Sequence, residues 1–131
     1  MEHPNTKLVT DMYAAFARGD IAAIRDTYFA PDIVFYIPGD NVISGEYRGI
    51  DEVFRLFGLL AKETGGTFHL EVHDVAGSDD HGVGLVTGKG ERNGKPFAYR
   101  NIHVGHIKDG KITEWWDNPD MELFAAAWAK S

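Results

Sequence analysis

The stretch 98-AYRNIHVGHIKDGKITEWWD-117 decides how this chain folds. Two runs rich in β-branched and aromatic residues flank Asp109-Gly110, a dipeptide that accepts the positive φ angles of a two-residue hairpin turn. We therefore expect the final β-hairpin of a sheet here, with the rest of the chain built to enclose it. The hairpin also concentrates titratable and aromatic side chains, which are Asn101, His103, His106, Trp115, Trp116 and Asp117.

Composition limits the chain to one domain. It has 131 residues, of which 44% are hydrophobic and 25% charged, so we expect a single globular domain over residues 1–131 with a real core. The absence of cysteine excludes disulfides, thiolate metal sites and a cysteine nucleophile. The six histidines show no spacing that matches a metal site, so no metal is expected.

Charge and hydropathy bear on the partners. The formal net charge of −7, without a cluster of Lys and Arg, argues against nucleic acid, because binding to phosphates requires concentrated positive charge. The N-terminus lacks a basic region followed by an apolar core, and no apolar run approaches the length of a membrane span. We therefore expect a cytoplasmic protein with neither nucleic acid nor membrane as a partner.

Periodicity and capping residues predict three helices in the first half of the chain. The first begins at Asn5 or Thr6 and ends at Gly19, because glycine favours the left-handed conformation that ends a helix. Asp20 caps a second, shorter helix, and Asp51 caps a third. Each of these helices carries apolar residues at spacings of three and four.

Strands follow in the second half. Alternation predicts strands over 68–73 and 83–91, with Asn93-Gly94 as another hairpin turn before the final hairpin. Residues 33–37 are predicted as one earlier strand, residues 38–49 as a loop, and Asp120 as the cap of a C-terminal helix. Helices followed by a four-strand antiparallel meander indicate an α+β fold.

Four phrases, in this order and spacing, resemble the SnoaL-like branch of the NTF2-like superfamily: 13-YAAFARGD-20, 29-FAPDIVF-35, 44-SGEYRGIDEV-53 and 109-DGKITEW-115. The resemblance implies an α+β cone, in which a curved mixed or antiparallel sheet wraps the N-terminal helices and leaves an apolar pocket at its open end. Members include polyketide cyclases, ketosteroid isomerases, epoxide hydrolases and proteins that only bind or assemble. Only the residues that line the pocket can distinguish among these functions.

The polyketide cyclases give the closest match in the pocket. In them an aspartate on the last strand removes a proton next to a carbonyl, and a histidine fourteen residues earlier holds the developing enolate. Asp117 and His103 have this spacing, and Asn101 stands where the cyclases place an amide. The resemblance thus implies Asp117 as the base, His103 and Asn101 as oxyanion donors, and no cofactor. The expected walls of the pocket for a hydrophobic carbonyl compound are Tyr13, Phe16, Tyr36, Phe57 and Trp115.

Two other enzyme templates fit less well. The isomerase base would fall near Tyr36 or Ile37, and neither is an acid. The epoxide hydrolases need Arg and Asp on a strand that here is the apolar run 82-GVGLVT-87, which cannot position a water molecule. The competing interpretation is a non-catalytic protein that binds a small molecule or assembles on the same cone. By the same resemblance, an exposed sheet face with Trp116 and Ile107 would suit a homodimer.

The register of the final hairpin leaves the catalytic interpretation open. With a plain two-residue turn, His103 lies opposite Trp116 and Asp117 lies opposite Ile102, on different faces of the sheet. A bulge, for which Gly105 is a candidate, would shift the register by one and bring His103 and Asp117 to one face. Otherwise residues 117–120 are simple turn and helix-cap chemistry.

Overall fold

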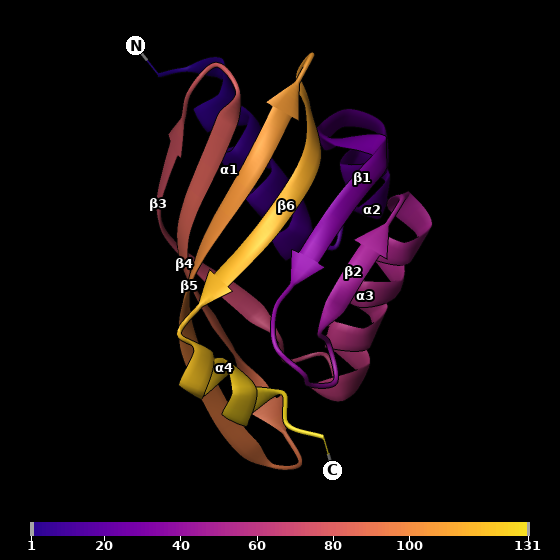
Figure 1. The fold of residues 1–131 in the computed structure, drawn as a ribbon, viewed down its shortest axis with the longest axis vertical. Coiled ribbons are helices and arrows are strands. Elements are labelled where there is room, and N and C mark those ends of the chain that lie inside the picture. Colours follow the sequence, from indigo (N-terminus) through magenta and orange to yellow (C-terminus); the bar gives the residue numbers. More distant parts are fainter. Residues whose placement is uncertain (1, 131) are drawn as a thin grey trace.

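A computed structural model describes residues 2–130 of the chain (Figure 1). In chain order its elements are α1 (Pro4–Arg18), α2 (Ile21–Ala23), the π-helical turn η1 (Ile24–Tyr28), β1 (Phe29–Ile37), β2 (Gly45–Arg48), α3 (Ile50–Glu63), β3 (His69–Gly77), β4 (His81–Arg92), β5 (Lys95–Lys108), β6 (Lys111–Pro119) and α4 (Met121–Ala127). The six strands form one sheet in the order β2-β1-β6-β5-β4-β3. Only the β1–β6 pair is parallel, so the sheet is mixed and the predicted α+β class is confirmed.

The predicted helices are present, and α1 and α3 begin a few residues away from their predicted first residues. Gly19 adopts φ +69° and ends α1, while the Asp20 side chain accepts a hydrogen bond from the backbone of the next helix. α1 begins earlier than predicted, after His3, because proline at the first helical position already has the required φ. α3 begins after Gly49, which places Asp51 inside the first turn, where its charge favours the helix dipole.

Two strand predictions are corrected at the edge formed by β1 and β2. β1 starts at Phe29 and includes Pro31, which lies where the pairing with β6 is irregular and no ladder hydrogen bond is needed from it. Residues 45–48, predicted as loop, form the short strand β2, which pairs with β1. This pairing covers the outer edge of β1 and brings α3 beside it (Figure 1).

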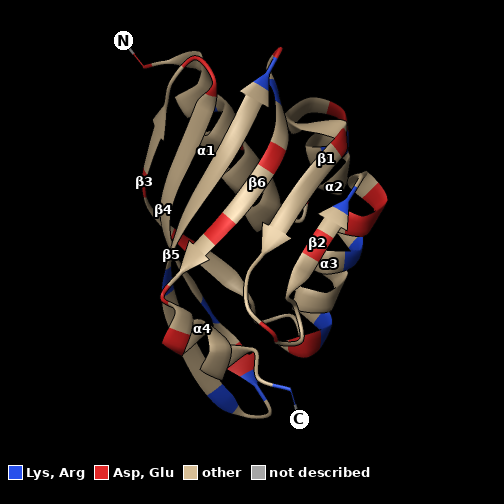
Figure 2. Ribbon diagram, viewed as in Figure 1, with Lys and Arg blue, Asp and Glu red and all other residues tan. Residues whose placement is uncertain are grey.

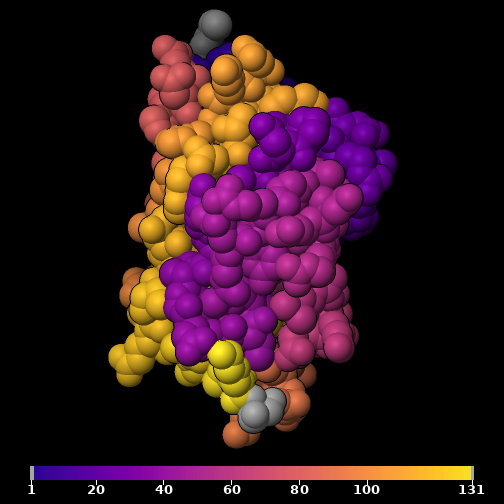
Figure 3. Space-filling view, turned by 45° about the vertical axis from the view of Figure 1, so that its right-hand side comes forward, coloured from indigo at the N-terminus to yellow at the C-terminus, as the bar shows by residue number. Residues whose placement is uncertain are grey.

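The core lies between the curved sheet and its helices. α1 crosses one face of the sheet, while β1, β2 and α3 close the side seen in Figure 3. At the lower end, α4 caps the long β4–β5 hairpin and places Phe124 and the following Trp128 in the core, both with no exposed surface. The cone therefore has a floor made of aromatic side chains.

Glycines on the inner face of β4 bring α1 close to the sheet. Gly82, Gly84, Gly88 and Gly90 occupy inward positions of the strand, and Val86 is the one inward side chain between them. A Cβ at Gly84 would stand 2.0 Å from the Tyr13 hydroxyl oxygen. Gly82 and Gly84 thus leave the space that Val9 and Tyr13 of α1 fill, whereas Gly88 and Gly90 make room for Tyr99 and Phe97 of β5.

Surface charge is spread over the molecule. Figure 2 shows Lys and Arg dispersed over separate elements without a basic patch on the face that it presents. Across residues 2–130, no helix combines the length and the apolar character needed to cross a membrane.

Candidate active site

The register of the final hairpin places His103 directly opposite Asp117 on the inner face. Asp109 and Gly110 form the predicted turn with φ of 51° and 74°. One extra residue of β6, Thr113, then shifts the pairing. The bulge needed for a shared site is therefore present, on β6 rather than at Gly105.

Gly105 does not form the predicted bulge but makes room for a tryptophan ring. It lies opposite Trp115, and a Cβ on it would stand 2.9 Å from the indole ring. Without the bulge, Glu114 would face Gly105 and the indole would have to leave this space. Packing of the indole over Gly105 thus accompanies the register that brings His103 and Asp117 together.

Four polar side chains form a connected cluster on the inner face. The hydroxyl of Tyr13 lies 2.7 Å from Nδ1 of His103, and His103 Nε2 lies 3.5 Å from Oδ1 of Asp117. The amide nitrogen of Asn101 donates to Asp117 Oδ2 at 3.0 Å, while its oxygen accepts from the backbone N–H of Asn118. Contacts on both sides of the amide fix its orientation.

Burial perturbs both titratable partners. The side chains of His103 and Asp117 are 7% and 12% exposed. Burial raises the pKa of the Asp117 carboxyl, although the nearby His103 and the Asn101 amide oppose the rise. Burial lowers the pKa of the His103 imidazole, and the Asp117 charge opposes that change. Strongly perturbed groups in a hollow are typical of functional sites.

The cluster lies at the polar end of an apolar cavity. Its total void, with the open mouth included, is about 560 Å³. Its lining residues come from helices, strands and the loop after β1: Met12, Tyr13, Phe16, Phe35, Ile37, Ile43, Leu56, Phe57, Leu60, Phe68, Leu70, Tyr99, Asn101, His103, Trp115 and Asp117. No Lys or Arg lines it.

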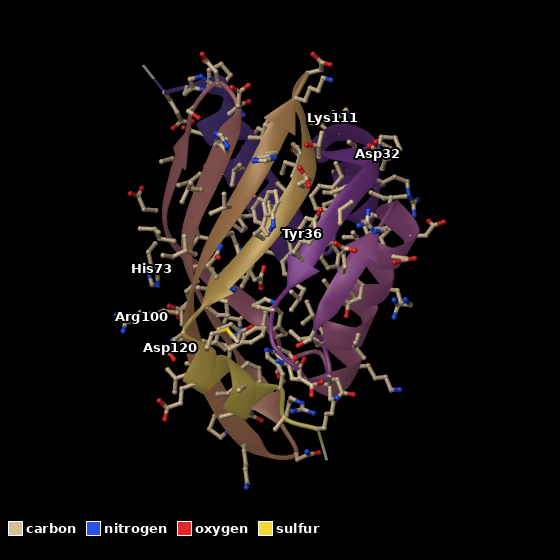
Figure 4. The ribbon with its side chains drawn as sticks, in the orientation of Figure 1. Asp32, Tyr36, His73, Arg100, Lys111 and Asp120 are labelled. Carbon is tan, nitrogen blue, oxygen red and sulfur yellow. The ribbon has the colours of Figure 1, made fainter. Side chains whose placement is uncertain are left out.

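Of the predicted walls, Tyr13, Phe16, Phe57 and Trp115 line the cavity, but Tyr36 lies outside it. Its neighbours in β1 face inward, so Tyr36 faces outward (Figure 4). There its hydroxyl donates to Glu114 at 2.9 Å and its ring stacks on Trp116, with centroids 4.9 Å apart. The prediction of Tyr36 as a wall is therefore wrong.

Ile107 is also placed differently from the prediction. It shares the inward positions of β5 with His103 and Gly105 and is only 5% exposed, so it belongs to the core rather than to an outer face. Trp116 does lie on the outer face, where it is partly exposed.

Sequence reasoning missed several lining residues, of which Tyr99 is the most informative. Tyr99 lies two residues before Asn101 and four before His103, so a period-two reading of this strand would have found it. Its hydroxyl accepts from the Trp128 indole at 3.1 Å, which connects the cavity to the aromatic floor. The others come from α1, β1, the loop after β1, α3 and the start of β3, where an apolar pattern predicts burial but does not say which side chains border a cavity.

Residues 2–130 contain no group of three or more His, Asp or Glu side chains arranged to hold a metal ion. The His106–Glu114 pair on the outer face, 3.0 Å apart, contacts Tyr36 instead.

The arrangement defines an α+β cone protein with an apolar cavity and an acid–histidine pair inside it. Residues 9–115 match the model of the SnoaL-like domain. The chain belongs to this family. It is 33% identical over 107 residues to an uncharacterised protein of Mycobacterium tuberculosis, which covers 81% of each chain.

Solved structures share the fold. Bal32a, from a soil-derived mobile gene cassette, is 29% identical with a TM-score of 0.90, and the match covers 95% of this chain and 96% of that one. TerC, which was co-crystallised with polyporic acid, is 22% identical with a TM-score of 0.82 over 95% and 98% of the chains. IdmH, a proposed polyketide cyclase from Streptomyces antibioticus, is 20% identical with a TM-score of 0.76 over 95% and 98%. At these identities, TerC and IdmH bear on the fold alone.

Proposed function

We propose that this protein is a cofactor-independent enzyme that removes a proton next to the carbonyl group of a hydrophobic compound, leading to isomerisation or aldol-type cyclisation. One observation carries the proposal. Asp117 faces inward and shares the only polar end of the aromatic cavity with His103 and Asn101. A carboxylate and a hydrogen-bond donor side by side are what proton abstraction and enolate stabilisation require.

Asp117 is the base in this mechanism. Burial raises its pKa, which makes the carboxylate a stronger proton acceptor than one in water. The Asn101 amide holds one of its oxygens through a 3.0 Å hydrogen bond and thereby directs the carboxylate toward the cavity. General-base catalysis of this kind contributes about 10²–10⁴ in rate.

His103 supplies the oxyanion donor. Its Nε2 lies next to Asp117, so a carbonyl oxygen bound there would sit close to both the base and the donor. One preorganised donor is worth about 10²–10³ in rate. Asn101, whose amide nitrogen donates to Asp117 and lies 3.3 Å from His103 Nε2, positions this pair and contributes to the polar end of the site.

The cavity walls favour an uncharged ligand. Aromatic rings such as Phe16, Phe57 and Trp115 surround the void, and the only ionised group that lines it is the carboxylate. An anionic ligand would meet Asp117 without a compensating Lys or Arg, which is costly in a buried site. A neutral hydrophobic ketone meets no such cost.

Exchange of α-protons in heavy water tests the proposal. Ketones of one, two and three rings, including 2-tetralone, would be incubated with wild type, Asp117→Asn and the control Asp32→Asn, an exposed carboxylate on β1 (Figure 4). NMR should show exchange accelerated by wild type and the control, and slowed by about 10²–10⁴ in Asp117→Asn. Quenching of Trp115 fluorescence measures binding separately. Ketones that bind without faster exchange would contradict catalysis and support a binding protein.

We also propose that the outer face of the sheet pairs two copies of the chain. Leu85 and Ile102 lie opposite each other on β4 and β5 and are 42% and 46% exposed. They adjoin an apolar row that crosses four strands through Val83, Val104, Trp116 and Tyr36. Leu85 and Ile102 line a hollow whose other lining residues include Arg100 and Asp120, two opposite charges that a two-fold axis could pair across the interface (Figure 4). A protein that sediments as a monomer at every concentration would contradict this pairing.

A further inference from the structure

We infer that the hydroxyl of Tyr13 sets the tautomer of His103: by donating to Nδ1 it keeps the imidazole neutral, with its proton on Nε2. His103 is then a hydrogen-bond donor, and Asp117 is the base. The roles in this inference rest on the proposed function, whereas the tautomer is a property of the free protein. Tyr13 is therefore a positioning residue that acts through His103.

The direction of the hydrogen bond between Tyr13 and His103 determines which ring nitrogen carries the proton. The Tyr13 oxygen lies 2.7 Å from His103 Nδ1, and either atom could donate. This is the only hydrogen bond that the hydroxyl makes within residues 2–130. Were Nδ1 to donate, the hydroxyl hydrogen would be left buried without a protein acceptor, which is costly. The bond therefore runs from Tyr13 to Nδ1.

The consequence follows on the other side of the ring. With Nδ1 as acceptor, neutral His103 carries its hydrogen on Nε2, the ring nitrogen that lies 3.5 Å from Oδ1 of Asp117. The Asn101 amide already directs a hydrogen to the other carboxylate oxygen. Asp117 thus has an amide donor on one oxygen and the ring N–H beside the other, an arrangement that favours its ionised form.

The opposite tautomer has one point in its favour. The Asn101 amide nitrogen is 3.3 Å from His103 Nε2 and could donate to it if that nitrogen were unprotonated. In that tautomer the Tyr13 hydroxyl hydrogen has no acceptor, and the lone pair of Nε2 lies beside the negatively charged carboxylate of Asp117. The Tyr13 contact, which is 0.6 Å shorter than this one, therefore decides between the two.

The surroundings hold Tyr13 in place for this purpose. Gly84 leaves the space in which the hydroxyl sits, because a Cβ there would be 2.0 Å from the oxygen. The Tyr13 and His103 rings are nearly parallel, with centroids 5.8 Å apart, and Trp115 packs against His103 at 5.0 Å. The imidazole is therefore packed between two aromatic rings.

The arrangement also opposes the imidazolium. Protonating Nδ1 would reverse the bond from Tyr13, and this adds to the burial that already lowers the His103 pKa. A neutral His103 cannot compete with Asp117 by holding an extra proton. The position of the Tyr13 hydroxyl thus makes His103 the hydrogen-bond donor and leaves Asp117 as the base.

Nitrogen NMR of the free protein tests the inference without a substrate. Long-range ¹H–¹⁵N spectra of the histidine rings, with His103 identified by its loss in His103→Gln, report which nitrogen carries the proton. Wild type at neutral pH should show a protonated Nε2 and an unprotonated Nδ1. Tyr13→Phe should move both ¹⁵N shifts toward each other as the tautomers mix. The matched control Tyr47→Phe, which removes another buried hydroxyl that donates to a carbonyl, should leave them unchanged.

A protonated Nδ1 in wild type would overturn the inference, and so would unchanged His103 shifts in Tyr13→Phe. Because these readouts need no ligand, they stand even if no ketone is exchanged. Conversely, exchange that depends on Asp117 together with a protonated Nδ1 would retain the proposed function and reject the role of Tyr13. If exchange does occur, its pH profile in Tyr13→Phe should shift relative to wild type rather than only fall in amplitude.

Discussion

Gly84→Ala is a sharp test of how the cone is packed, because it adds one methyl group at the contact between α1 and β4. The new Cβ would stand 2.0 Å from the Tyr13 hydroxyl oxygen and 2.8 Å from its Cζ. Neither distance is tolerated between non-bonded atoms, so Tyr13 must move. That movement breaks the 2.7 Å hydrogen bond to His103.

The magnitude follows from three contributions. Overpacking a well-filled core costs about 1–3 kcal/mol. Loss of one buried hydrogen bond adds about 0.5–1.5 kcal/mol. Replacement of glycine by alanine restricts the unfolded chain and returns about 0.4–1 kcal/mol. The net destabilisation is about 2 kcal/mol.

Urea denaturation followed by circular dichroism measures how much Gly84→Ala lowers the free energy of unfolding, first in the wild-type protein and then in Tyr13→Phe. In Tyr13→Phe the atom nearest to the new methyl is absent, so the cost of Gly84→Ala should fall to about 1 kcal/mol. Gly58→Ala is the control, since nothing lies within 4 Å of its Cβ position in α3, and it should stabilise the protein by about 0.5–1 kcal/mol. An equal cost of Gly84→Ala in both backgrounds, or no cost at all, would refute this account of the packing.

Two further predictions concern titration and assembly. The folded pKa of His103 is lowered from 6.5, so its stabilising contribution is present above that pH and is lost as the pH falls toward the folded pKa. Denaturation at about pH 7.5 and about pH 5.5 should thus show a smaller loss of stability in His103→Gln than in wild type; an equal loss would show that His103 titrates normally. Ile102→Lys should weaken the proposed dimer at least tenfold in sedimentation experiments, whereas Ile21→Lys, which replaces an apolar residue exposed to 39% on α2, should leave it intact.

Much of the fold could be predicted because its signals are local. Asn93-Gly94 and Asp109-Gly110 form the two predicted turns with positive φ angles, and Gly19 ends α1 in the left-handed region. These outcomes depend on the conformational preferences of one or two residues. The α+β class follows from the order of the elements, and the resemblance of four phrases to the SnoaL-like branch is confirmed by the match of residues 9–115 to the SnoaL-like domain model.

The candidate site could be predicted only in part, because its residues meet through register and packing. The sequence suggested Asp117, His103 and Asn101, but a plain turn would have separated the first two. The bulge at Thr113 joins them, and no glycine or proline marks it.

The amino-acid sequence by itself determined most of the elements, two hairpin turns and the residue types available to the site, whereas the strand at residues 45–48 depends on its pairing with β1. Tertiary structure alone decided that Tyr36 faces away from the cavity and that the Tyr13 hydroxyl contacts His103 rather than the void. The reason is physical: a turn depends on the φ and ψ angles of a few neighbouring residues. In contrast, the set of side chains that share a cavity depends on contacts between distant residues. One example is the packing of Trp115 over Gly105, which are ten positions apart in the sequence and lie on paired strands.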